Sequence, residues 1–399
     1  MRSIIRLFFR TLRLVLAPFM LLSEKLTRGS ALERSPAQQA EVDAETAKLA
    51  LYQFSTCPFC IKARRAMQRL REKPLSPEDV HVIPGAAGGP KALGISGLDK
   101  AIFGDWLPRV PQERSLIGSS IGSWRFAAVA SSDDPKSQLG RLAELYTAQR
   151  FAKGVSAAEV SRKSVLFPEE LLGGREDAIL NHPWYRLNVV VVRSLGMLAE
   201  DARGRLGLGL MGAISANMVS RRHLGRFMER GIIHDARLNV PVSNLVVFPS
   251  HEVAFTRDNL LPALLASASI PLVMSGVRHI PGAPEGVYRD GGLLDYHLDL
   301  PYQQPGVVLY PHFTDKVVPG WFDKSLPWRR GDASRLQDVL LVAPSRSYLE
   351  SLPDRKLPDR KDFERYAGDD AGRERAWRSA IAERERLGDE SLALIDTGH

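Results

Sequence analysis

The chain has 399 residues, of which 44% are hydrophobic and 25% charged, and its formal net charge is +8. These are the values of an ordinary globular protein, with room for one large α/β domain plus appendages or for two medium domains. The only two cysteines lie three positions apart, which excludes a disulfide framework and favours a reducing cytosolic compartment. The basic residues form no stripe interleaved with aromatic side chains, which argues against nucleic acid as a partner.

The first segment, residues 1–28, begins with a basic amphipathic helix. Arg2, Arg6, Arg10 and Arg13 recur at helical spacing, and apolar residues cover the rest of the surface. Such a helix suits an anionic membrane surface, so we expect a cytoplasmic protein held at the inner membrane by this segment. A transmembrane anchor with snorkelling arginines and a helix packed on protein are the alternatives. No small-residue cleavage site follows, which disfavours a secretory signal.

A polar linker at 29–47 leads to a strand, a turn containing Cys57-Pro-Phe-Cys60, and a helix. A thiolate at a helix start is stabilised by the helix dipole and by backbone N–H groups, so Cys57 would be a reactive nucleophile and Cys60 the resolving thiol. YQFSTCPFCIKARRAM resembles the active-site strand and helix of a glutaredoxin, which implies glutathione or a protein thiol as partner. The resemblance ends near residue 72, before that family's further strands. We therefore interpret 48–75 as a vestigial or grafted β–α unit, with a working redox site as the alternative.

From residue 79 to 346, strand-like and helical segments alternate, which is the signature of a parallel sheet with helices on its faces. Residues 92–107 and the segment after Ser120 read as helical, and 134–185 is helix-rich. After 346 the sequence LPDRK occurs twice in tandem before an Arg/Glu-rich helix, so we expect 347–399 to be a charged, solvated tail without chemistry. The expected strands are 81–85, 115–118, 187–192, 243–248, 306–310 and 338–342.

A serine motif lies between an expected strand and an expected helix. Gly118-Ser119-Ser120-Ile121-Gly122 matches G-x-S-x-G. The glycines permit the sharp, strained turn that lifts Ser120 clear of its neighbours, and the helix points its positive end at a reacting oxygen. The strand–turn–helix setting is what makes this short pattern informative.

Two glycine motifs flank this serine in the sequence. Upstream, HVIPGAAGGPKALG places Gly88 and Gly89 between a strand and a helix, where backbone N–H groups bind phosphate or an oxyanion. Downstream, Asp290-Gly291-Gly292 follows a strand-like end, where the glycines let another loop approach the carboxylate. Without the rest of the set, this last motif predicts only a turn.

In chain order, the glycine loop, G-x-S-x-G and D-G-G resemble the patatin-like phospholipase family over about 80–345. SASIPLVMSGV, at 267–277, resembles the Ala/Ser-rich helix and Ile-Pro segment that precede the family's aspartate. The resemblance implies a three-layer α/β/α fold with a mainly parallel central sheet. It also implies a cofactor-free hydrolase of phospholipids or other lipid esters.

The resemblance further implies a Ser–Asp dyad, in which Ser120 attacks the ester carbonyl, Asp290 accepts its proton, and an acyl-enzyme forms. An aspartate with its ordinary pKa of about 3.9 is a poor base, so burial must raise the pKa of Asp290. Backbone amides of three residues would stabilise the oxyanion: Gly88, Gly89 and Ile121. Five further residues would support the motifs: Gly118, Gly122, Lys91, Gly291 and Gly292.

The oxyanion loop departs from the family's usual G-G-G-x-K/R-G. Here it reads Ala87-Gly88-Gly89-Pro90-Lys91-Ala92, so Lys91 is retained in register while two glycine positions carry alanine. Pro90 also removes one N–H donor. These differences leave open which amides form the oxyanion hole.

Three other interpretations remain. Ser120, Asp290 and then His297 or His312 follow the chain order of an α/β-hydrolase triad. A glutaredoxin-derived redox or sensor protein with a non-catalytic lipid-binding domain is the second, and a catalytically inactive membrane scaffold is the third.

G-x-G-x-x-G at 207–212 lacks a preceding strand, so we expect a flexible apolar segment bordering the lipid cleft. No His/Glu/Cys cluster has metal-ligand spacing, and no metal is expected.

Overall fold

The computed structural model describes residues 75–151, 155–303 and 305–382. The predicted N-terminal helix at 1–28, the linker, and the cysteine pair Cys57 and Cys60 lie outside the described residues. Among the described helices, none has the length and apolar composition needed to cross a membrane.

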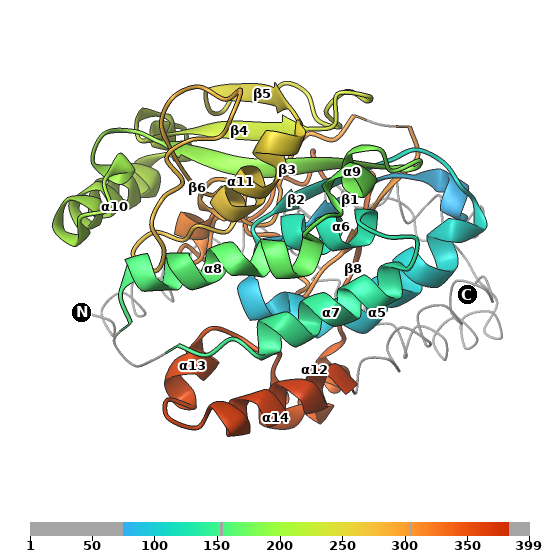
Figure 1. The fold of residues 1–399 in the computed structure, drawn as a ribbon. Coiled ribbons are helices and arrows are strands. Elements are labelled where there is room, and N and C mark those ends of the chain that lie inside the picture. Colours follow the sequence, from blue (N-terminus) through green and yellow to red (C-terminus); the bar gives the residue numbers. More distant parts are fainter. Residues whose placement is uncertain (1–74, 152–154, 304, 383–399) are drawn as a thin grey trace, which may run out of the picture.

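An eight-stranded, mainly parallel sheet forms the centre of the structure (Figure 1). Its strands are β1 (Val80–Gly85), β2 (Arg114–Ser119), β3 (Tyr185–Ser194), β4 (Met228–His234), β5 (Ser250–Ala254), β6 (Val287–Asp290), β7 (Val307–Pro311) and β8 (Val339–Val342). The order is β5-β4-β3-β2-β1-β7-β8, and β6 also pairs with β3. The strands from β8 to β3 in this order are parallel, whereas β4 and β6 both run antiparallel to β3. The central strands are buried along almost their whole length, as expected for apolar parallel strands covered on their faces.

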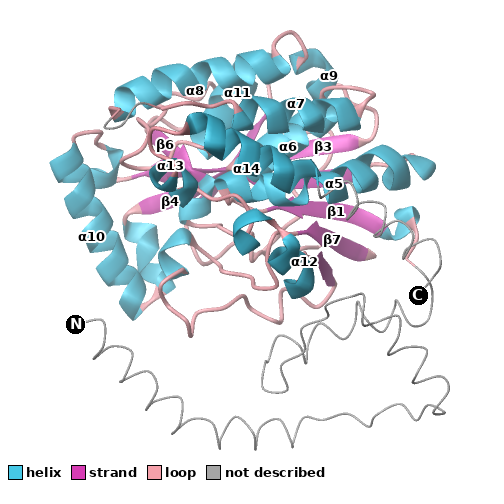
Figure 2. Cartoon of the chain, turned by 90° about the horizontal axis from the view of Figure 1, so that it is seen from below, coloured by secondary structure: helices cyan, strands magenta, loops and turns pink. Residues whose placement is uncertain are grey.

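Ten α-helices are described. They are α5 (Ser96–Lys100), α6 (Ile121–Ala130), α7 (Pro135–Thr147), α8 (Ala157–Leu172), α9 (Glu176–Leu180), α10 (Arg203–Val219), α11 (Arg257–Ser267), α12 (Arg346–Ser351), α13 (Lys361–Arg365) and α14 (Asp370–Ala382). Helices α6 and α11 contact the strands, with α7 and α8 packed outside them (Figures 1 and 2). The predicted mixed α/β fold with a mainly parallel sheet is confirmed.

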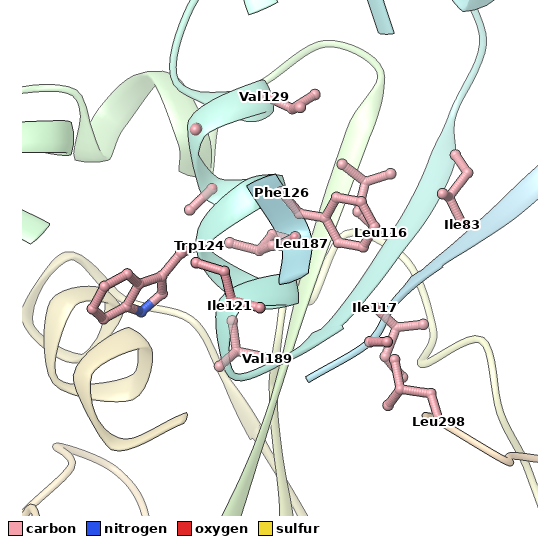
Figure 3. Close-up of a cluster of buried hydrophobic side chains, with 14 of the residues drawn as sticks. Ile83, Leu116, Ile117, Ile121, Trp124, Phe126, Val129, Leu187, Val189 and Leu298 are labelled. Atoms are coloured by element: carbon pink, nitrogen blue, oxygen red, sulfur yellow. The ribbon is translucent and has the colours of Figure 1, made fainter. Parts of the chain in front are cut away.

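Helix α6 is buried on all sides because the sheet lies on one face and other helices on the opposite face. Phe126 points toward β2 (Figure 3), whereas Trp124 points away from the sheet and stacks on Phe167 of α8 at 4.6 Å between ring centroids. The Trp124 indole also donates a hydrogen bond to the Leu264 carbonyl of α11. A helix held this firmly fixes the position of the turn that precedes it.

Strand β3 brings two distant segments of the chain to one point. Its first six residues pair with β2, ending at Ser119 opposite Val190. Its last four pair with β6, where Asp290 lies opposite Val191. Because β4 occupies the other edge of these last four residues, β2 and β6 lie on the same edge of β3 and meet end to end. The residues at their carboxyl ends are therefore neighbours.

The predicted strand at 243–248 is wrong. This segment forms turns, Val246 is 86% exposed, and Asn244 has a positive φ of 52°. Two prolines, Pro241 and Pro249, flank it, and proline cannot donate to a strand ladder. The sheet is extended by β4 and β5 instead. Likewise, the G-x-G-x-x-G segment lies within α10 and is not a flexible segment.

The C-terminal segment up to residue 382 packs on the domain, contrary to the expected solvated tail. Leu352, Leu357 and Trp377 are buried, and Trp377 joins a small apolar cluster with Leu93. The Trp377 indole donates to Asp362 at 3.0 Å. Helix α14 thus lies against α7 (Figures 1 and 2), and it fixes the loop that leads into α13.

We expect Trp377→Ala to loosen residues 353–365, because removing a fully buried tryptophan costs about 3 to 5 kcal/mol. Hydrogen exchange should then become faster in this segment while the amides of β3 remain protected. The control is Trp328→Ala, which removes a tryptophan that is 52% exposed and should leave exchange at 353–365 unchanged. Unchanged exchange in the Trp377 variant would contradict the anchoring role.

Candidate active site

Ser120 occupies the turn between β2 and α6 in a strained conformation, with φ 57° and ψ −126°. Close packing forms this turn. A Cβ on Gly122 would lie 1.9 Å from the Gly85 carbonyl oxygen, and one on Gly118 would lie 2.4 Å from the Ser123 amide nitrogen. Both predicted glycine positions therefore require glycine. The Ser120 amide itself donates to the Ser267 hydroxyl at 2.9 Å.

Asp290 lies directly beside this serine. The Ser120 hydroxyl donates to Asp290 Oδ2 at 2.8 Å, and the Gly292 amide donates to Asp290 Oδ1 at 2.7 Å. Gly291 is required for the approach, because a Cβ there would lie 2.2 Å from the Val190 carbonyl oxygen. The structure therefore brings together the serine and aspartate motifs that the sequence singled out.

The environment of Asp290 shifts its pKa. Burial is the largest cause and raises the pKa above its ordinary value of 3.8, because the charged form loses hydration. The positive charge of Arg360 and the hydrogen bond from Ser120 offset part of this rise. The net effect is a raised pKa, so the Asp290 carboxylate is a stronger base than a solvated aspartate.

The predicted oxyanion loop borders the same site. Gly88 lines the cavity with Ser120, and a Cβ on Gly88 would lie 2.5 Å from the Phe313 ring. Gly89 follows with a φ of 57°. Lys91 also lines the cavity, with its ammonium group 5.3 Å from the Phe313 ring centroid. Ile121 is the first residue of α6, so its amide lies at the positive end of that helix.

A cavity of about 600 Å³ opens onto the serine and the aspartate. This volume is typical of small-molecule sites. Its apolar lining comes from the oxyanion loop, α10, the segment after α11, the turn after β6, and the region near 321: Ala87, Leu210, Ile270, Pro271, Leu272, Val273, Leu293 and Trp321. Its polar lining, besides the dyad, is Lys91, Tyr296, Lys324, Asp359, Arg360 and Lys361. Apolar walls beside the Ser120 hydroxyl suit a ligand with an acyl chain.

Neither histidine of the alternative triad is hydrogen-bonded to the serine or the aspartate. Nδ1 of His297 lies 2.9 Å from the Lys316 carbonyl oxygen and accepts from the Val318 amide. Nδ1 of His312 contacts Thr314, and Nε2 of both rings has no hydrogen-bond partner among the described residues. The structure therefore provides no relay from Asp290 through either histidine to Ser120. No group of three or more His, Cys, Asp or Glu in the described ranges is arranged to hold a metal ion.

Several residues of the site were missed by sequence reasoning. Ser267, which holds the turn, lies within the SASIP segment, so its motif was visible although its contact was not. Lys324, Arg360 and Tyr146 come from three segments with no motif, apart from the tandem LPDRK that contains Arg360. No local pattern indicates that these side chains gather at Ser120.

Fold and site together define an α/β domain with a serine at a strand–helix turn. A family model described as patatin-like phospholipase matches residues 109–297. Residues 109–297 are therefore similar to a patatin-like phospholipase domain, which supports a lipid acyl hydrolase family for this part of the chain. Ser120 and Asp290 lie within the match, whereas the oxyanion loop and Arg360 lie outside it. No curated protein matches the chain.

We expect Asp290→Asn to be more stable than the wild type above about pH 4. The asparagine accepts from the Gly292 amide and donates to Ser120, but it carries no buried charge. Because burial raises the native pKa of Asp290 above 3.8, ionisation destabilises the native state as pH rises through and beyond this value. Urea unfolding from pH 4 to 8 should show that the free energy of unfolding of Asp290→Asn exceeds that of the wild type. This difference should be absent at the lowest pH and should grow as the pH rises. A difference that shrinks with rising pH would contradict the direction of this shift.

Proposed function

We propose that the protein is a serine hydrolase of lipid carboxylic esters, with Ser120 as nucleophile and Asp290 as its base. The observation that carries this proposal is the 2.8 Å hydrogen bond between the two side chains at the floor of an apolar-walled cavity. The patatin-like phospholipase match over both residues supports the same assignment. Phospholipids or other lipid esters are the proposed substrates.

The reaction has two halves. Ser120 Oγ bonds to the ester carbonyl carbon while Asp290 takes the hydroxyl proton, and the carbonyl oxygen becomes an oxyanion. The amides of Gly88, Gly89 and Ile121 are the proposed oxyanion donors. Collapse breaks the bond to the leaving alcohol, which takes the proton from Asp290 and leaves an acyl-enzyme. Water then attacks the acyl carbon while Asp290 takes its proton; the bond to Ser120 Oγ breaks, Oγ takes the proton back from Asp290, and the fatty acid leaves.

We further propose that the protein works at a membrane surface. Apolar side chains lie exposed on α10, where Met211 is 60% and Met218 58% exposed, and Leu210 of the same helix lines the cavity. Leu272 and Val273 line the cavity and are also partly exposed. An apolar rim continuous with the cavity lets a lipid leave the bilayer without crossing water. Placement at the cytoplasmic face, through the helix at 1–28, belongs to this proposal.

Catalysis is tested with a chromogenic short-chain ester such as p-nitrophenyl butyrate. Ser120→Ala and Asp290→Asn should each lower kcat by about a thousandfold or more, because nucleophile and base act as a unit. A fluorophosphonate should label the wild type on Ser120, as read by mass spectrometry of the peptides. Retained activity or labelling in Ser120→Ala would refute the nucleophile.

Two controls separate the alternatives. His297→Asn should stay active once its folding is verified, and an inactive, folded variant would instead support the triad. Cys57→Ser should match the wild type, because the proposed reaction uses neither Cys57 nor Cys60. Dithiol exchange at Cys57 with no esterase activity would favour the redox function.

The membrane proposal predicts a selective loss on lipid surfaces. Met211→Ser combined with Met218→Ser should lower the ratio of activity on phospholipid vesicles to activity on a soluble ester about tenfold, because less apolar area enters the bilayer. Vesicle sedimentation should show weaker binding. The matched control, Val165→Ser with Leu166→Ser on α8, removes similarly exposed apolar groups and should keep the ratio. An equal loss in both double variants would exclude a specific docking face.

A further inference from the structure

Four basic side chains line the cavity beside Ser120. They come from three separate segments: Lys91 from the oxyanion loop, Lys324 from the region after β7, and Arg360 and Lys361 from the C-terminal segment. Only two carboxylates of the described residues line the same cavity, Asp290 and Asp359. Lys91 is half-buried, whereas Lys324, Arg360 and Lys361 are exposed, so these charges stay partly hydrated and their positive excess attracts an anion to the cavity.

Neither carboxylate forms an ion pair with these four basic residues, although their charges act on one another at longer range. Asp290 accepts its hydrogen bonds from Ser120 and the Gly292 amide. Asp359 is paired at 3.2 Å with Lys356, which does not line the cavity. Among the ion pairs found in the described part of the chain, none involves any of the four basic residues of the cavity.

The cations are held in place by rings and backbone. The Lys324 ammonium group lies 3.9 Å from the Tyr296 ring centroid. The Arg360 guanidinium lies against the oxyanion loop, since a Cβ on Gly89 would be 3.0 Å from its Nε and 3.3 Å from the Tyr146 hydroxyl. Burial, together with the charges of Lys91 and Arg360, lowers the pKa of Lys324 to about 8. These groups repel one another, and a bound anion would relieve that repulsion.

We propose that Lys91, Lys324 and Arg360, with Lys361 at the rim, form a subsite for the phosphate of a lipid whose head group is net negative. This inference rests on the proposed function, because it names the substrate that Ser120 would cleave. In a glycerophospholipid the phosphate lies a few bonds from the ester carbonyl, so a single cavity accommodates both groups. A zwitterionic choline head group would bring a cation toward these basic residues, where neither carboxylate of the described lining is without a partner to receive it.

All four basic residues of this subsite lie outside the matched family range, with Lys91 before its start at residue 109. Lys324, Arg360 and Lys361 all follow the end of the match at residue 297. Leu357 and Trp377, which lie on either side of Arg360 in the sequence, are both buried and anchor this segment on the domain. The C-terminal segment therefore contributes to substrate selection, in addition to covering the domain.

The test uses lipids with identical short chains, kept below the concentration at which they form micelles. This removes the attraction of a basic protein to an anionic surface, which would otherwise imitate head-group selection. The substrates are dihexanoylphosphatidylglycerol, dihexanoylphosphatidylcholine and the uncharged dihexanoylglycerol. The wild type should show a kcat/KM about tenfold or more higher for phosphatidylglycerol than for phosphatidylcholine.

The decisive variant is Lys324→Gln combined with Arg360→Gln. Its ratio of kcat/KM for phosphatidylglycerol to kcat/KM for dihexanoylglycerol should fall about tenfold or more, mainly through KM. The matched control is Arg375→Gln, an exposed arginine on α14 that does not line the cavity, and it should keep the wild-type ratio. Equal wild-type rates on the two phospholipids, or an unchanged ratio in the double variant, would overturn the subsite while leaving the hydrolase proposal intact.

Failure of the hydrolase proposal gives a different result, because none of the three substrates would then be cleaved. The subsite is in that case measured by calorimetry on Ser120→Ala with dihexanoylphosphatidylglycerol and, separately, with inorganic phosphate. Binding of the lipid that is lost when Lys324→Gln and Arg360→Gln are added supports the subsite. No binding of the lipid, or equally tight binding of inorganic phosphate, overturns a subsite for a lipid head group.

Discussion

The site depends on the register of β3. One edge of this strand pairs first with the end of β2 and then with the end of β6, so Ser119 and Asp290 face the adjacent positions Val190 and Val191. Backbone hydrogen bonds fix both pairings, and β4 holds the opposite edge. A slip of one residue would turn the side chains to the other face of the sheet and separate Ser120 from Asp290. The geometry of the dyad is therefore a property of the sheet and not of two flexible loops.

Burial and charge act in opposite directions at this site. Loss of hydration raises the pKa of Asp290, which favours proton transfer from Ser120, whereas the cations around it favour the ionised form. A carboxylate that is both ionised and basic needs this balance. The same cations are available to a negatively charged substrate, so one arrangement links the proposed chemistry to the proposed head-group preference.

The residues that line the cavity extend beyond the range that the family model matches. The matched range holds the serine and the aspartate, while the oxyanion loop precedes it and the basic C-terminal wall of the cavity follows it. Helix α10 lies within the match and contributes Leu210 to the cavity lining. We propose that these surrounding segments adapt the site to a particular substrate and surface.

The sequence by itself determined the features that depend on neighbouring residues. The glycines of the Ser120 turn, the buried strands and the helix after the serine all follow from local sterics and hydrophobic patterning. It failed at 243–248, where an apolar run between prolines forms turns, and in the C-terminal segment, where buried leucines and Trp377 outweigh a charged composition. Only the tertiary structure decided that Asp290, rather than His297, reaches Ser120, and that Arg360 joins the cavity. Contacts between residues far apart in the chain depend on strand register and packing, which leave no periodic signal in the sequence.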